Sequence, residues 1–114
     1  MIEAIVIQYL DGLDGLTAYA ERPENPPGEY LLIEKTGGRM ENQIRTAMIA
    51  VQSYADSLLR AAEINCCVEE AMLGITDLRN ISRCRLNSSY NYTDTESKKY
   101  RYQAVFDLTY MEGE

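Results

Sequence analysis

The chain has 114 residues, 46% of them hydrophobic and 25% charged, which is the composition of a folded domain with one hydrophobic core. We therefore expect a single domain over residues 1–114. The net charge of −7 argues against a general affinity for nucleic acid, because phosphate binding needs clustered lysine and arginine side chains.

The N-terminal segment predicts a short helix followed by a strand. Apolar residues recur at helical spacing from Ile2 to Leu10, and Asp11–Gly12 is expected to end the helix. The segment has no basic start, so we expect no secretory signal, and no apolar stretch approaches the roughly 20 residues of a membrane span. A short strand at Thr17–Glu21 then leads into a stiff, proline-rich loop at Arg22–Gly28.

Two further strands are predicted over Tyr30–Lys35 and Arg45–Tyr54. Between them, Thr36–Gln43 contains two glycines and several charged or amide side chains, so we expect a hairpin tip longer than a minimal turn. The run Lys35–Arg39 has a superficial likeness to a phosphate-binding loop. It lacks the Gly-Lys-Ser/Thr ending and does not lead into a helix, so a hairpin tip is the better interpretation.

The clearest helix is predicted over residues 55–74, where polar positions recur every three or four residues and form one stripe. The stripe consists of Asp56, Arg60, Glu63, Cys67, Glu70 and Gly74. Asn65 and Glu69 are exceptions, because they lie within the apolar arc. Either their polar ends reach solvent near an edge, or another subunit covers this helix and Glu69 is paired across the contact.

The last two strands are predicted from alternation. From Tyr100 to Tyr110 every second residue is large or apolar, which is typical of a strand with one buried and one solvated face. The segment Asp77–Tyr92 alternates more weakly. Its expected core side carries Leu78, Ser82, Cys84, Leu86, Tyr90 and Tyr92. A turn at Thr93–Ser97 would place Arg85 opposite Asp107 and Leu86 opposite Phe106.

These elements predict an α+β fold in the order α-β-β-β-α-β-β. We expect an antiparallel or mixed sheet of four to five strands with two helices on one face. Tyr102, Phe106, Leu108 and Leu86 are predicted to lie in the core between the sheet and the helices.

The sequence offers no candidate catalytic, cofactor or metal site, and we do not expect an enzyme. It contains no histidine, which is the commonest general base and metal ligand. Cys66, Cys67 and Cys84 are too few and unsuitably spaced for zinc, and we expect reduced thiols of a cytosolic protein. Cys67 should be exposed on the polar stripe, whereas Cys84 should belong to the core.

Basic residues gather on the predicted sheet face opposite the helices. They are Arg79, Arg83, Arg85, Lys99 and Arg101. One interpretation is a solvated face with cross-strand partners such as Asp107. The other is a subunit interface that matches this basic patch to an acidic edge of a neighbour.

Four stretches of the sequence together resemble a known group of proteins. They are Pro23–Pro27 continuing through Tyr30–Gly38, then Val51–Ala55, Leu86–Asn91 and Tyr100–Val105. In this order they resemble small tail-terminator or tail-completion proteins, often labelled minor capsid proteins, of long-tailed phages and prophages of Firmicutes. The similarity covers nearly the whole chain.

The resemblance implies a subunit of a homo-oligomeric ring, usually a hexamer, at the head-proximal end of the virion tail. The ring would assemble in the host cytoplasm, cap the tail tube and join it to the head–tail connector protein. The implied partners are other copies of the chain, the tail-tube protein and the connector, without cofactor, membrane or specific nucleic-acid binding. Two alternatives stay open: a head-completion or connector protein, and a non-phage ligand- or protein-binding domain of the same fold.

Contacts with these partners are expected at the two hairpin tips, Thr36–Gln43 and Thr93–Lys99, which are too polar to build a core. Glu69 and part of the basic face complete the candidate surface. The candidate contact residues are Arg39, Met40, Glu41, Asn42, Glu69, Arg79, Arg83, Arg85, Thr95, Glu96, Lys98 and Lys99.

Overall fold

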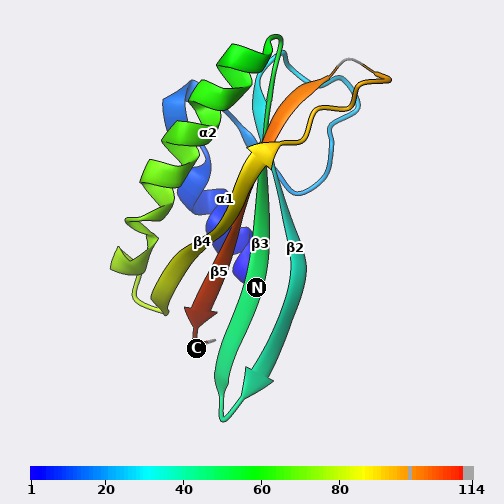
Figure 1. Ribbon diagram of the computed structural model, residues 1–114. Helices are drawn as coiled ribbons and strands as arrows, with labels where there is room; N and C mark the ends of the chain where they lie inside the picture. Colours follow the sequence, from blue (N-terminus) through cyan, green and yellow to red (C-terminus); the bar gives the residue numbers. More distant parts are fainter. Residues whose placement is uncertain (98, 112–114) are drawn as a thin grey trace.

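Two α-helices cover one face of a five-stranded mixed sheet in the computed structural model, which describes residues 1–97 and 99–111 (Figure 1). The elements are α1 (Ile2–Leu10), β1 (Ala18–Tyr19), β2 (Tyr30–Glu41), β3 (Ile44–Ala55), α2 (Leu58–Met72), β4 (Ile81–Asn91) and β5 (Tyr100–Tyr110), with 3-10 turns η1 (Leu13–Gly15) and η2 (Ile75–Asp77). The strand order is β1-β2-β3-β5-β4, with β1 parallel to β2 and the other pairs antiparallel. The predicted α+β class and element order are confirmed.

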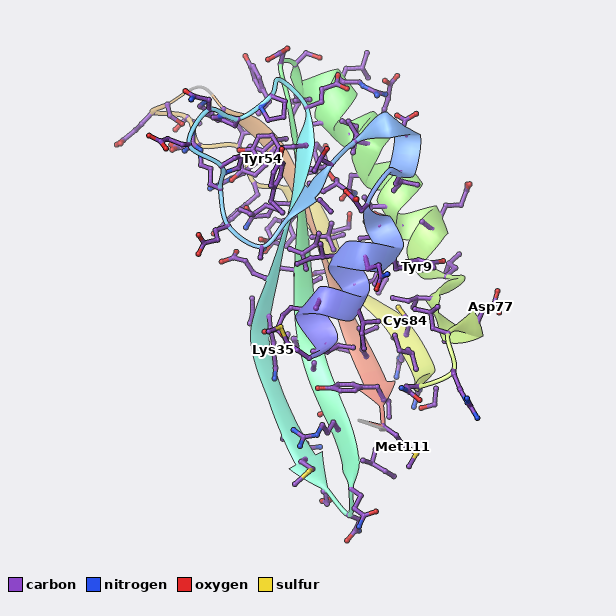
Figure 2. The ribbon with its side chains drawn as sticks, turned by 180° about the vertical axis from the view of Figure 1, so that it is seen from behind. Tyr9, Lys35, Tyr54, Asp77, Cys84 and Met111 are labelled. Carbon is purple, nitrogen blue, oxygen red and sulfur yellow. The ribbon has the colours of Figure 1, made fainter. Side chains whose placement is uncertain are left out.

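The helices begin and end where local chemistry favours it. Gly12 follows α1 with a φ of +92°, a conformation that glycine adopts without steric cost. Ser57 caps α2, because its hydroxyl accepts a hydrogen bond from the backbone N–H of Arg60 at 3.2 Å. The Tyr9 hydroxyl donates to the carbonyl of Ala71 at 2.7 Å and so joins the two helices (Figure 2).

The main core lies between the helices and the sheet. Ile64 of α2 packs in one cluster with Ile49, Phe106 and Leu108 of the central strands. Phe106 and Leu108 are buried as predicted, and Tyr102 packs partly against the same cluster. The prediction for Leu86 is wrong: 47% of this residue is exposed, because β4 is the edge strand of the sheet.

The hairpin between β2 and β3 differs from the prediction of a long polar tip. Pairing continues to Glu41 opposite Ile44, and the turn is only Asn42–Gln43, both with positive φ. Such two-residue turns match the twist of paired strands. The glycines suggested a loop, but they are built into the ladder. A β-bulge lies between Lys35 and Gly37.

Two β-bulges in β4 change which side chains face the helices. The predicted pairs Arg85–Asp107 and Leu86–Phe106 are confirmed. The register shifts between Ile81 and Arg83 and again between Leu86 and Ser88. Because a one-residue shift moves the following side chains to the other face, Tyr90 lies opposite Gln103 on the helix-free face. The prediction that Tyr90 and Tyr92 face the core is therefore wrong.

The helix-free face of the sheet is not simply solvated, which corrects the prediction for β5. Gln103 and Val105 point to this face and are only 8% and 7% exposed. A smaller apolar cluster of Tyr30, Leu32 and Tyr54 lies on the same side. The Tyr30 and Tyr54 rings stack within this cluster, 4.5 Å between centroids, and Gln52 beside it donates to Gln103 Oε1 at 2.8 Å.

Candidate interaction surfaces

The tip of the β2–β3 hairpin extends beyond the rest of the sheet (Figure 1). Arg45 already pairs with Tyr110 at the last position of β5. Beyond this pair, β3 is paired with β2 alone among the described residues. Its apolar side chains are exposed: Met40 by 59% and Ile44 by 47%. Ile44 shares the helix-free face, whereas Met40 points to the opposite side of the ribbon, so both faces of the tip carry apolar surface.

The predicted contact residues Arg39, Glu41 and Asn42 are all exposed on this tip. Met48, farther along β3, extends the apolar surface on the helix-free side and is 39% exposed. The structure therefore brings the first four candidate residues together on one projecting element, although not on the long loop that was expected.

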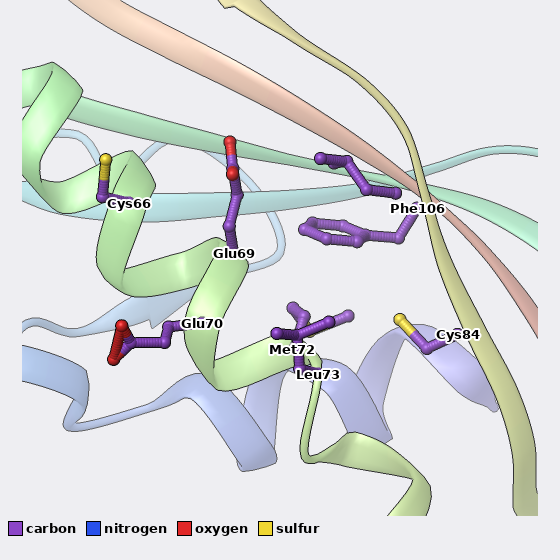
Figure 3. A pocket seen from close by; sticks show the side chains of 8 residues that line it. Cys66, Glu69, Glu70, Met72, Leu73, Cys84 and Phe106 are labelled. Atoms are coloured by element: carbon purple, nitrogen blue, oxygen red, sulfur yellow. The ribbon is translucent and has the colours of Figure 1, made fainter.

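A groove lies between the C-terminal part of α2 and the edge of the sheet, with a volume of about 330 Å³. Figure 3 shows Met72 of α2 and Leu73 directly after it on one side, and Phe106 and Cys84 of the sheet on the other. Leu73 is 73% exposed, and the partly exposed Leu86 lines the groove as well. The remaining lining residues are Cys66, Glu69 and Glu70.

Glu69 is tied to β4 through a small polar network. The Asn65 amide donates to Glu69 Oε2 at 2.9 Å and to Ser89 Oγ at 2.7 Å, and Ser89 donates to Glu69 Oε2 at 2.5 Å. Asn65 is 3% exposed, so the interpretation that its polar end reaches solvent is wrong. Glu69 is half-buried with its carboxylate held in a fixed position, and a second subunit is not needed to pair it.

The polar stripe of α2 is partly covered, which changes the interpretation of the cysteines. Arg60 contacts Asp14 Oδ2 at 2.7 Å and Glu29 Oε2 at 2.9 Å, so loops from two other segments lie against the stripe. Cys67 is half-buried and not exposed as predicted, whereas Cys66 is exposed. Cys84 is half-buried, and burial, helped by the negative charge of Asp107, raises its pKa to about 11.

The predicted basic face is only partly assembled. Arg83 and Arg85 point to the helix-free face opposite Thr109 and Asp107 and are exposed. Arg79 does not belong to this face, because it precedes β4 and lines a cavity of about 450 Å³ beside α1. The weak alternation of residues 77–80 was mistaken for strand, whereas η2 and a turn occupy them.

The Arg101 side chain makes contacts within its own chain, so it does not contribute to a free basic patch. Its guanidinium donates to the Tyr54 hydroxyl at 2.7 Å and to the Tyr92 carbonyl at 2.6 Å. It also lies 4.4 Å from the centroid of the Tyr92 ring, a favourable cation–π distance.

The turn between β4 and β5 is held by its own side chains. Asp94 accepts hydrogen bonds from the Glu96 backbone N–H at 3.0 Å and from the Ser97 hydroxyl at 2.9 Å, and these bonds lower its pKa. Thr95, Glu96 and Lys99 are exposed, while the candidate residue Lys98 lies outside the described residues.

The groove is the feature that sequence reasoning missed. Leu86 was assigned to the core because alternation alone does not reveal that β4 is the edge strand. The run Asn87–Ser88–Ser89 was the available signal, since three polar residues in succession break alternation at the bulge.

Neither protein-family models nor curated proteins give a match to this chain. Among residues 1–97 and 99–111, no helix is both long and apolar enough to cross a membrane. Within the same residues, no three His, Cys, Asp or Glu side chains cluster as metal ligands.

Proposed function

We propose that the protein is a phage or prophage tail terminator, a subunit of a ring that caps the tail tube and joins it to the head connector. The observation that carries this proposal is the projecting β2–β3 tip, with Met40 and Ile44 exposed on opposite faces. An apolar element that residues 1–97 and 99–111 leave uncovered favours a role in assembly over a role as an isolated monomer. The sequence resemblance supplies the kind of assembly.

The mechanism is physical capping. One surface of the ring matches the last ring of the tube and stops growth, because the opposite surface does not accept another tube subunit. Such a ring uses heterologous contacts that close after a fixed number of copies. No bond is made or broken, and a head-completion or connector role would use the same ring with different neighbours.

A second candidate function is a ligand-binding domain, which the apolar groove beside α2 favours. Its volume of about 330 Å³ lies at the lower end of the range for small-molecule sites. An apolar ligand that binds a single chain with the hairpin left exposed would support this candidate.

To test this function, the tail-tube protein of the same phage or prophage is polymerised with and without the purified protein, and tube lengths are measured by electron microscopy. We expect shorter tubes with added density at one end. A matched variant removes Met40, Glu41, Ile44 and Arg45, which leaves the Asn42–Gln43 turn to close on the existing pair of Arg39 and Thr46. This variant should fold and should not cap. Unchanged tube lengths with the wild-type protein would refute the terminator function.

A further inference from the structure

We infer that the β2–β3 hairpin tip of one copy inserts into the α2–β4 groove of the next copy, and that this contact joins the subunits around the ring. The inference rests on the proposed function and adds to it the two surfaces that meet. Both surfaces come from the same chain, so the expected partner is a second copy.

The shape of the tip favours insertion over flat packing. Met40 lies on one face of the ribbon and Ile44 on the other, and each is about half exposed. A flat partner surface would bury only one of them. A groove with two walls buries both, and the apolar area removed from water is correspondingly larger.

The groove supplies two such walls. Met72 at the end of α2 and Leu73 directly after it form one wall, and Phe106 of β5 lies on the other side (Figure 3). Leu86 of β4 also lines the groove. Leu73 and Leu86 are 73% and 47% exposed, so the part of the chain that the structure describes leaves much of their apolar surface uncovered. The tip and the groove therefore both expose apolar side chains that a partner could bury.

The charges of the two surfaces are complementary. The hairpin tip carries two basic residues, Arg39 and Arg45, against one acidic residue, Glu41, so it has one positive charge in excess, whereas Glu69 and Glu70 line the groove. The last turn of α2 contains no basic residue, so the partial negative charge of the helix C-terminus adds to that of the carboxylates. Asn65 and Ser89 hold the Glu69 carboxylate in place before any contact is made.

The contact must form between copies. The strand order places β5 between β3 and β4, and the tip extends past the end of β5, so a chain cannot fold its hairpin into its own groove without breaking the sheet. A tip on one side and a groove on another make a head-to-tail contact, which closes into a ring or continues as a filament.

Cysteine cross-linking tests this contact directly, because Cys66 is exposed at the groove. The variant Met40→Cys places a thiol on the tip, and mild oxidation should then produce a ladder of disulfide-linked chains that collapses on reduction. Peptide mapping should join the introduced thiol to Cys66. Cys84 also lines the groove, but its raised pKa leaves little reactive thiolate.

Two controls make the result specific. The double variant Met40→Cys with Cys66→Ser should lose most of the ladder. Asn25→Cys places an exposed thiol on the proline-rich loop and should give no ladder. Circular dichroism of each variant establishes that it is folded before oxidation.

The outcomes separate this contact from the proposed function. Assemblies of wild-type size in which Met40→Cys links no better than Asn25→Cys would overturn the hairpin–groove contact and leave the terminator function intact. A ladder that maps to Cys67, or to two introduced thiols, would also overturn the contact. Failure of the wild-type protein to assemble, alone and with tube protein, would overturn both.

Discussion

Leu86 lies directly opposite Phe106 on neighbouring strands, yet Phe106 is 2% exposed and Leu86 is 47% exposed. The two side chains point to the same face of the sheet, but α2 covers β5 and only reaches the margin of β4. This difference marks the boundary between the core and the groove.

The first prediction compares these two residues. Phe106→Ala should lower the free energy of unfolding by about 3–5 kcal/mol, because it leaves a cavity in the core. Leu86→Ala should cost less than about 1 kcal/mol, the usual range for a partly exposed site. Denaturant unfolding followed by circular dichroism measures both. Equal costs would contradict the boundary described above.

The second prediction concerns the two adjacent glycines of β2. A Cβ at Gly38 would lie 2.8 Å from the carbonyl oxygen of Thr46, so Gly38→Ala should strain the hairpin and cost about 1–3 kcal/mol. Gly37→Ala is the matched control, since its nearest atom would be the Met48 sulfur at 3.8 Å. Thermal melts of the two variants should therefore differ. Coincident melts would argue against the close pairing of β2 and β3.

The third prediction follows from the raised pKa of Cys84, about 11. At pH 8 nearly all of this thiol is protonated, so an alkylating reagent should modify the exposed Cys66 first and Cys84 last. Raising the pH toward 11 should accelerate the modification of Cys84. Mass spectrometry of digested samples gives the order, and early labelling of Cys84 in the folded protein would contradict its burial.

The raised pKa of Cys84 also makes the stability of the protein depend on pH. The folded pKa lies above the ordinary thiol value of 9.0, so the unfolded chain releases this proton first. The Cys84 contribution to stability should therefore decrease as the pH rises from about 9 toward 11. Cys84→Ala should flatten the pH dependence in this interval, and an unchanged profile would count against the shift.

The fourth prediction concerns DNA. The chain carries a net charge of −7, and Arg101 is engaged with Tyr54 and Tyr92 inside the molecule. A ring of such subunits should repel DNA phosphates, so that a genome passes its lumen without binding. We expect no binding of the assembled protein to duplex DNA at low salt. Measurable affinity that weakens with added salt would favour a DNA-contacting connector role instead.

Much of the fold could be predicted from the sequence, because local pattern determines it. The alternation from Tyr100 to Tyr110 gave the bounds of β5, and helical spacing with Asp11–Gly12 gave those of α1. The turn predicted before β5 gave the pairs Arg85–Asp107 and Leu86–Phe106 correctly, but not the register shifts on either side of them.

The candidate surface was less predictable, because it depends on which strand lies at the edge and where bulges fall. The bulge after Leu86 moves the Tyr90 side chain to the other face of the sheet. The alternation pattern of one strand does not reveal such an inserted residue. Gly37–Gly38 indicated a loop, although both lie in β2 and Gly38 permits the close approach of the β3 backbone at Thr46. The groove combines residues from α2, β4 and β5, so only the assembled fold reveals it.

The most direct test of the central claim is the mass of the particle that the protein forms, measured by analytical ultracentrifugation or mass photometry over a range of concentrations. For a ring-forming terminator we expect one closed species at a fixed multiple of the 13.0 kDa chain, sixfold for the hexamer, formed alone or on addition of the tail-tube protein. The variant with the register-preserving shorter hairpin should stay at the mass of one chain. A wild-type protein that remains at 13.0 kDa under all these conditions would contradict a ring-forming function.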